Sequence, residues 1–412
     1  MEFIADFHIH SKYSRATSRD MDIEHIAEWA KLKGISLMGT GDFTHHLWLE
    51  ELKANLEDLG NGLFKFRDVY FMLTTEISSI YSKKGRGYRI HSIIFAPSLK
   101  TVDKINNVLA RWGNLASDGR PILGIDVAEL ARIVFDIDED CFFVPAHVWT
   151  PWFSLFGSMS GFDRIEDCFE KQTSNIFTLE TGLSSDPAMN WRWSQLDRFS
   201  LISNSDSHSP SRIGREANVL NCDLSYRSII DTLKSKDKDR FLYTIEFFPQ
   251  EGKYHFDGHR LCGVSFSPKE TRAHNTICPK CGKRLTIGVM NRIEQLSDRP
   301  DDYVLSDAIP YKNLIPLDEI IAEAKGINKT TKAVGAEYRM AVSKLAPELY
   351  ILLKIEKEEL EKKLPKRIAE GILRVREGRV ILKPGFDGEY GKISIFTDDE
   401  RQQKQEQQLS LF

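Results

Sequence analysis

Short apolar or β-branched runs recur through the first half of the chain, and they end close to histidines or carboxylates. Segments with apolar residues at helical spacing, such as 23–30, separate these runs. The alternation predicts an α/β fold, and polar side chains collected at strand ends are typical of the active face of a parallel (β/α) barrel. The runs and the polar residues that they reach are 35–38 before Asp42, 69–73 before Glu76, 90–95 around His91, 141–144 before His147, 177–179 before Glu180 and 201–202 before Asp206.

The polar residues at these strand ends include the types that bind metal ions. One residue separates His8 from His10 and Asp206 from His208, so the side chains of each pair point to one face of a strand. A single histidine pair could be structural, but so many ligand types at strand ends indicate a metal site. The predicted ligands are His8, His10, Asp42, Glu76, His91, His147, Asp206 and His208.

This ligand set also predicts a chemistry. Imidazole with carboxylate suits zinc, manganese or iron, and more than four ligands imply that one carboxylate bridges two ions. Such a cluster favours hydrolysis of a phosphate ester by metal-activated water. We expect Zn²⁺, Mn²⁺ or Mg²⁺ in the cluster, with Glu76, Asp206 and His208 as its catalytic residues.

A second metal site is predicted further along the chain. His259 and Cys262 form an H-x-x-C pair, and Cys278 and Cys281 form a C-x-x-C pair. Together they make the four-ligand set of a closed structural zinc site. His255 or His274 could replace His259, but only His259 repeats the spacing of the second pair.

The chain of 412 residues is too long for a single core, so two or three domains are expected. Periodicity is lost near Phe248 and returns after the cysteines. We therefore divide the chain into a metal-binding α/β section, 1–248, a zinc-binding module, 249–300, a mostly helical C-terminal section, 301–397, and a flexible polar tail, 398–412.

Charge and hydropathy exclude several classes of protein. The formal net charge of -4 argues against a protein-wide basic surface, so any polyanion site must be local, as around Lys280, Lys283, Arg284 and Arg292. No apolar run approaches the roughly 18 residues that span a bilayer, and the N-terminus lacks the features of a secretory signal. We expect a cytoplasmic protein with no membrane partner.

The first section resembles the PHP (polymerase and histidinol phosphatase) family. The motifs that carry the resemblance are Asp6-Phe7-His8-Ile9-His10-Ser11, Thr40-Gly41-Asp42, Glu76, His91, His147 and Asp206-Ser207-His208. It implies a distorted (β/α) barrel with a trinuclear metal site. Two positions depart from the family pattern: Gly41-Asp42 stands where Asp-His is usual, and Arg15 replaces a frequent ligand. We expect Arg15 either at the surface or on a substrate phosphate.

Nearly the whole chain is similar to the endonuclease Q family. The added motifs are 254–260, Cys278-Pro279-Lys280-Cys281-Gly282 and 384–391, which reads Pro-Gly-Phe-Asp-Gly-Glu-Tyr-Gly. The resemblance implies a DNA repair endonuclease that cuts 5′ to deaminated bases (uracil, hypoxanthine, xanthine) and abasic sites, with a C-terminal section that binds DNA. The alternatives are a PHP phosphoesterase or exonuclease acting on another phosphate ester, and a noncatalytic nucleic-acid-binding protein.

An enzyme that distinguishes uracil from cytosine must reach a base edge that stacking hides, so extrusion of the base into a pocket is expected. Trp149 and Trp152 lie in the aromatic segment that begins just after His147 and are suited to stack against such a base. Alternatively, these aromatic residues pack their loop against the barrel.

The last residues, Gln408-Leu409-Ser410-Leu411-Phe412, resemble the short peptide by which bacterial repair proteins bind the DNA sliding clamp. Large apolar side chains at the tip of a polar arm gain nothing from water, which favours a pocket on a partner. The alternative is that Leu409, Leu411 and Phe412 anchor the tail to their own domain. With a damaged-DNA substrate, the protein would associate with the nucleoid during repair.

Overall fold

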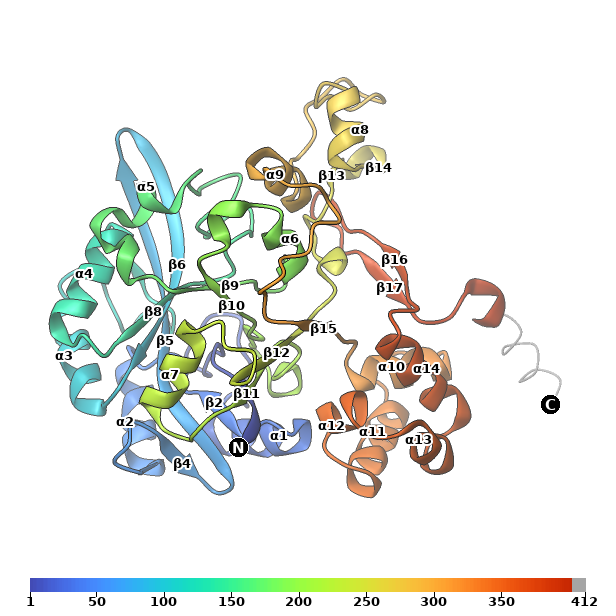
Figure 1. Cartoon of the computed structure of the whole chain (residues 1–412), viewed down its shortest axis with the longest axis horizontal. Coiled ribbons are helices and arrows are strands. Elements are labelled where there is room, and N and C mark those ends of the chain that lie inside the picture. Colours follow the sequence, from blue (N-terminus) through green and yellow to red (C-terminus); the bar gives the residue numbers. More distant parts are fainter. Residues whose placement is uncertain (402–412) are drawn as a thin grey trace.

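The computed structural model describes residues 1–401 and centres on a curved, eleven-stranded sheet (Figure 1). Its spatial order is β15-β12-β11-β1-β2-β5, with β6 following beside β5 and β8 beside β6. The strands are β1 (Glu2–Asp6), β2 (Leu37–Gly39), β3 (Glu57–Asp58), β4 (Phe64–Phe66), β5 (Val69–Lys83), β6 (Arg86–Ala96), β7 (Ile122–Leu123), β8 (Phe142–Pro145), β11 (Ala217–Asn221), β12 (Phe241–Glu246) and β15 (Tyr311–Asn313).

The sheet curves into a distorted barrel. The short parallel pair β9 (Thr178–Glu180) and β10 (Ser200–Ile202) follows β8, and the Val148 amide donates to the Glu180 carbonyl oxygen at that junction. Between β10 and β11, the Asn218 side chain accepts from the Ser203 amide and donates to the Ser203 carbonyl oxygen. A side chain therefore bridges the last gap between strands. This architecture confirms the predicted α/β class.

The pairing is mixed rather than parallel throughout. β1, β2 and β5 are parallel neighbours, whereas β5 and β6 form a long antiparallel hairpin. β6 with β8 and β1 with β11 are also antiparallel neighbours, although each pair is far apart in the chain. The expectation that Glu76 and His91 lie at strand ends was therefore wrong, because both lie inside the hairpin strands. Lys84 and Gly85, both with positive φ, form the turn that sends the chain back.

Helices cover the sheet as the periodicity predicted. The helix expected over 23–30 is α1 (Ile23–Lys33); Asp22 caps its start and Gly34, at φ 85°, ends it. Tyr226, Ile229 and Leu233 of α7 share a buried cluster with side chains of β1, β6 and β8. The other helices of this section are α2 (His46–Asn55), α3 (Leu99–Leu109), α4 (Val127–Ile137), α5 (Ile165–Phe169), α6 (Pro187–Trp191) and α7 (Tyr226–Lys234).

Two smaller parts project from the barrel on the side of α1 and α6 (Figure 1). The module that holds the cysteines contains β13 (Asp257–His259), β14 (Val264–Phe266), α8 (Pro268–Ala273) and α9 (Val289–Leu296). The C-terminal part contains α10 (Leu317–Lys325), α11 (Lys332–Lys344), α12 (Glu348–Leu353), α13 (Lys357–Lys363), α14 (Lys366–Arg376), β16 (Ile381–Lys383) and β17 (Lys392–Ser394). No helix among residues 1–401 is long and apolar enough to cross a membrane.

Chain segments cross the section boundaries drawn from the sequence. β15 pairs with β12 and so extends the barrel sheet, although it follows residue 300. The loop between β16 and β17 packs on the module that holds the cysteines, where the Phe256 amide donates to the Gly385 carbonyl oxygen and the Arg260 amide to the Asp387 carboxylate. Buried Lys33 of α1 forms an ion pair with buried Glu348 of α12 at 2.6 Å. These contacts fix both smaller parts against the barrel.

Candidate metal centre

Six of the eight predicted ligands form two groups that share Glu76. His8, His10, Glu76 and Asp206 make the first group, and Glu76, His91 and His147 make the second. Within each group the ligand atoms lie within 4.8 Å of one another. A carboxylate common to two groups is the arrangement that a bridged pair of ions requires.

The first group joins the start of the chain to the loop after β10. His8 and His10 follow β1, and their rings lie 5.3 Å apart, as the one-residue spacing predicted. His10 Nε2 lies 3.0 Å from Asp206 Oδ1 and 3.2 Å from Glu76 Oε2. His8 Nε2 lies 3.4 Å from Glu76 Oε2 and is buried without a hydrogen-bond partner in the described part of the chain. A buried nitrogen aimed at two carboxylates fits a metal ion.

The second group lies across the β5–β6 hairpin. His91 Nδ1 is 2.7 Å and His147 Nε2 is 3.0 Å from Glu76 Oε1. In the register of the hairpin, Glu76 faces Ile93 and His91 faces Ser78, so Glu76 and His91 are diagonal neighbours on one face. Each carboxylate oxygen of Glu76 thus faces a different group.

The charges of the site suit a cation. Burial alone would raise the pKa of Glu76, but neighbouring positive charges, including Arg120, hold it well below its ordinary value. The pKa of Asp206 is also lowered, because His8 and His10 outweigh the effect of its burial. Burial lowers the pKa of His91 to about 4. Around His8 and His10 the neighbouring carboxylates outweigh burial and raise the pKa of both imidazoles, so binding of a cation there would release protons.

The other two predicted ligands belong to neither group. Asp42 Oδ1 lies 3.1 Å from His10 Nδ1, and its other oxygen accepts from the Ser11 amide and the Ser11 and Ser14 hydroxyls. Asp42 therefore orients His10 from behind. His208 places its ring 4.5 Å from that of His10, and its Nδ1 lies 2.9 Å from the Asp206 carbonyl oxygen.

Glu180 has a similar orienting role that sequence reasoning missed. Its carboxylate lies 3.0 Å from His8 Nδ1 and accepts from the His147 amide and the Asn204 side chain. Its position at the end of the predicted strand 177–179 is the sequence feature that could have identified it. Arg120, whose Nη1 lies 3.0 Å from Glu76 Oε2, gave no signal in the sequence.

Three residues of the site have backbone conformations that side chains disfavour. Asp42, His147 and Asp206 have φ values of 50°, 29° and 46°. Such strain persists only where the surroundings enforce it, and it concentrates at functional sites. The strained residues support the assignment of the centre independently of its ligand types.

The four residues predicted to bind structural zinc also form one group: His259, Cys262, Cys278 and Cys281. Cys281 Sγ lies 3.5 Å from His259 Nδ1. Neither rival joins this group: His255 is buried elsewhere in the module, and His274 stacks on Phe266. Three thiols and one imidazole within 4.8 Å fit a tetrahedral metal ion.

Residues that contact the metal centre also line a cavity of about 580 Å³. Its lining includes Arg89, Thr150, Trp152, Phe153 and Tyr254. Thr150 Oγ1 lies 3.2 Å from His147 Nδ1, and the ring of Phe153 lies 4.9 Å from that of His91. The cavity therefore opens beside the second group of ligands.

The structure separates the two predicted stacking residues. Trp152 lines the cavity, edge-on to Tyr254 at 5.2 Å. Trp149 is buried, packs between Phe156 and Trp193 and donates to Asn190, which is the packing role left open above.

Three further predictions have different outcomes. Arg15 is 74% exposed and pairs with Asp118. Arg292, expected in a basic surface, is instead buried and donates to the carbonyl oxygens of Phe156 and Phe162. The predicted clamp-binding residues Gln408, Leu409, Leu411 and Phe412 lie outside the described residues.

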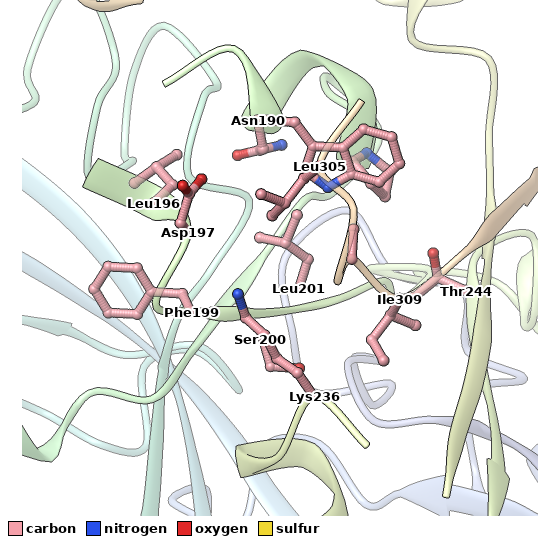
Figure 2. Close-up of a pocket in the computed structure, with 13 residues that line it drawn as sticks. Asn190, Leu196, Asp197, Phe199, Ser200, Leu201, Lys236, Thr244, Leu305 and Ile309 are labelled. Atoms are coloured by element: carbon pink, nitrogen blue, oxygen red, sulfur yellow. The ribbon is translucent and has the colours of Figure 1, made fainter. Parts of the chain in front are cut away.

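A much smaller cavity lies away from the metal centre, between β10 and the segment before β15 (Figure 2). Leu201, Leu305 and Ile309 contribute apolar walls, and the volume is about 20 Å³. This is room for about one water molecule. Unlike the larger cavity, it is not lined by Thr150 or Phe153, the residues that contact the second ligand group, so we assign it no part in the chemistry.

Comparisons with known proteins place these features in a family. A profile of the MJ0043 C-terminal domain matches residues 316–379, which hold α10 to α14. The uncharacterized protein MJ0043 of Methanocaldococcus jannaschii is 34% identical over 270 residues, covering 63% of this chain but only 33% of that protein. The uncharacterized protein YqxK of Bacillus subtilis is 30% identical over 414 residues, covering 94% of this chain and 98% of that protein.

Solved structures extend the match to the whole architecture. The lesion-specific endonuclease PfuEndoQ of Pyrococcus furiosus is 31% identical with a TM-score of 0.86, covering 96% of this chain and 95% of that one. The chain belongs to the endonuclease Q family. A complex of endonuclease Q with a 27-mer duplex that carries an abasic lesion at the active site gives a TM-score of 0.85 and 31% identity, covering 97% and 98% of the two chains. The family resemblance drawn from the motifs is thus confirmed, and the barrel, module and helices all belong to the endonuclease Q fold.

Proposed function

We propose that this protein is a metal-dependent DNA repair endonuclease that hydrolyses the phosphodiester 5′ to a lesion. The observation that carries the proposal is the pair of ligand groups sharing Glu76, within the fold of a family whose member was solved with an abasic lesion at its active site. The substrates that we propose are abasic sites and the deaminated bases uracil, hypoxanthine and xanthine. Cleavage would leave 3′-hydroxyl and 5′-phosphate ends.

The residues of the centre would either bind a metal ion or orient a residue that does. His8, His10 and Asp206 would hold one ion and His91 and His147 a second, with Glu76 between them. Ions at such a site supply a nucleophile from water at neutral pH and stabilise charge on the phosphodiester. Asp42 and Glu180 would keep His10 and His8 oriented with their Nε2 atoms toward the centre. We propose Zn²⁺, Mn²⁺ or Mg²⁺ for this centre, and a third ion would need His208.

The cavity beside the centre is the proposed site for an extruded base. Trp152 and Tyr254 offer aromatic faces, and Arg89 and Lys253 add positive charge to its lining. Aromatic stacking would compensate the extruded base for lost stacking in the duplex. The position of the cavity next to His91 and His147 would then bring the adjoining phosphodiester to the metal centre.

The other parts of the chain would bind the substrate and a partner. We propose structural Zn²⁺ at the cysteine group, DNA binding by residues 301–397 and the module before them, and catalysis by residues 1–248, with β15 part of the barrel sheet. The five terminal residues would bind the bacterial sliding clamp. A protein acting on damaged DNA would work at the nucleoid.

A panel of substrates tests this proposal against the phosphoesterase alternative. Duplexes that contain one uracil or one abasic site are compared with a cytosine duplex and a small phosphomonoester. The proposed function requires cleavage of the damaged duplexes with little turnover of the other two substrates. Preferential turnover of the phosphomonoester would support the alternative instead, and digestion of every duplex from its ends would support an exonuclease.

A further inference from the structure

Arg120 brings a permanent positive charge into the metal centre. Its Nη1 lies 3.0 Å from Glu76 Oε2, and its side chain is 27% exposed. It comes from the segment between α3 and β7, which contributes no metal ligand. A guanidinium has five donors and remains charged at all physiological pH values, so it is suited to bind a phosphate.

The backbone around Arg120 is fixed. A Cβ atom on Gly119 would lie 2.2 Å from Asp42 Oδ2, so only glycine lets the segment press against the centre. The Gly119 amide donates to the Tyr13 carbonyl oxygen, and the Pro121 carbonyl oxygen accepts from the Ser78 amide. Arg120 is thus held in place before any substrate arrives.

Asp118 holds a second arginine beside the first. Its Oδ1 accepts from the backbone amides of both Arg15 and Arg120, at 3.2 Å each, and its Oδ2 lies 3.3 Å from Arg15 Nε. Asp118 is buried, whereas the Arg15 side chain is 74% exposed. One carboxylate therefore organises two arginines, an inner one at the metal ligands and an outer one in solvent.

The ion pair with Glu76 engages Nη1, one of the three nitrogens of the Arg120 guanidinium. The same carboxylate faces four imidazole nitrogens at 2.7 to 3.4 Å, from His8, His10, His91 and His147. With cations bound to these ligands, a further cation would be repelled unless an anion lay between them. In the proposed reaction, that anion is the DNA backbone.

We propose that Arg120 binds the phosphate that is cut and that Arg15 binds a neighbouring phosphate of the same strand, with Asp118 as the positioning residue for both. This inference rests on the proposed function and assigns how its substrate is held. Arg120 would hold the phosphate and also stabilise the charge that builds on it during cleavage, so its removal should lower kcat in addition to weakening DNA binding. Arg15 would add binding energy in the ground state and the transition state alike, so its removal should raise KM.

The different roles of Arg120 and Arg15 can be measured by the kinetics of cleavage of a duplex with one abasic site. Arg120→Ala should lower kcat by about 100-fold. Arg120→Lys keeps the positive charge but lacks the paired N–H donors of the guanidinium, so it should recover part of the loss. Arg15→Ala should raise KM with kcat nearly unchanged. The control is Arg111→Ala, an exposed arginine of the same segment, which should change neither constant.

Binding to chemically altered DNA identifies the two phosphates without relying on turnover. Each arginine variant is combined with Asp206→Asn, and affinities are measured for abasic duplexes in which one phosphate is replaced by a neutral methylphosphonate. Arg120→Ala should weaken binding to the ordinary duplex but not to the duplex neutralised at the scissile position. Arg15→Ala should lose its effect only when a neighbouring phosphate is neutralised.

Asp118→Asn tests the positioning residue. Asparagine keeps the oxygen that accepts from both backbone amides but loses the attraction for the Arg15 side chain. The melting temperature and the selectivity at the scissile phosphate should persist, while selectivity at the neighbouring phosphate should disappear. A variant that kept its selectivity at both phosphates would contradict the assigned role of Asp118.

The two proposals fail in different ways. If the wild type cuts damaged duplexes and Arg120→Ala keeps its kcat and its sensitivity to the methylphosphonate, the arginine assignment is overturned and the proposed function stands. If the wild type cuts no damaged duplex, the proposed function falls. In that case, phosphate-specific effects of Arg120 and Arg15 on DNA binding would still support the assignment, and their absence would overturn it.

Discussion

His10 Nε2 lies 3.0 Å from Asp206 Oδ1, although 196 positions separate the two residues in the chain. The contact joins the segment after β1 to the loop after β10, on opposite sides of a barrel seam that Asn218 bridges. Metal binding is therefore tied to closure of the barrel. Asp206 is also the ligand with the largest exposure in its group, with 26% of its side chain accessible, so it borders the substrate side.

Replacement of Asp206 tests the metal centre. Asp206→Asn should reduce cleavage of a damaged duplex by about 1,000-fold, because the amide loses the charge that holds a catalytic ion. Affinity for the lesion should largely persist, since the DNA-binding surfaces are untouched. Single-turnover rates and binding titrations measure the two effects, with the exposed Asp223→Asn as the control. Cleavage near the wild-type rate would remove Asp206 from the site.

Replacement of Trp152 tests the base cavity. Trp152→Ala should slow cleavage at uracil by about tenfold, because an extruded base loses a stacking partner. Cleavage at an abasic site should change little, since no base is present to stack. The matched control is Trp112→Ala, a tryptophan that is 40% exposed and does not line the cavity. Equal losses on both substrates would show that Trp152 supports the loop and does not contact the base.

The cysteine group should hold about one chelator-resistant zinc ion per chain. A variant with both Cys278→Ser and Cys281→Ser should lose this ion and destabilise the module, because structural zinc contributes folding energy directly. Elemental analysis and limited proteolysis measure the two losses. Cys222→Ser, at a buried thiol outside the group, serves as the control. Unchanged zinc in the double variant would contradict the assignment.

Local spacing carries part of the information that defines the site. The one-residue spacing brings His8 and His10 into one ligand group, as expected, whereas the same spacing brings only Asp206, and not His208, into that group. The roles of Asp42 and Glu180 were not predictable, since only the fold decides whether a carboxylate faces an ion or supports a ligand. The hairpin of β5 and β6 was missed because its strands continue past the polar residues taken as strand ends.

The burial of single side chains and the contacts between distant segments also could not be predicted from the sequence, because the fold determines them. Trp149 and Trp152 are three residues apart in one aromatic run, yet one is buried and the other lines a cavity. Arg120 reaches Glu76 across 44 positions, through a glycine contact that no local pattern records. By contrast, the closely spaced pairs of the cysteine group predicted their partners correctly, because four ligands in one compact module leave few alternatives.

The terminal peptide provides a test of partner binding. Deletion of residues 408–412 should abolish micromolar binding to a bacterial sliding clamp, while nuclease activity on free oligonucleotides is unchanged. Calorimetric titration measures the binding, and Ser410→Ala should leave it intact. Equal binding by the full-length and truncated proteins would refute clamp recognition. A large fall in the melting temperature of the truncated protein would indicate a terminal anchor instead.

The proposed activity is measured by cleavage of end-labelled duplexes that carry a single lesion at a known position. We expect one cut, on the 5′ side of an abasic site or uracil, with a 3′-hydroxyl end that a polymerase extends. Metal chelation should abolish the cut, and the undamaged duplex should stay intact. Equal cutting of damaged and undamaged duplexes, or no cutting of any lesion in the presence of Zn²⁺, Mn²⁺ and Mg²⁺, would rule out a lesion-specific, metal-dependent endonuclease.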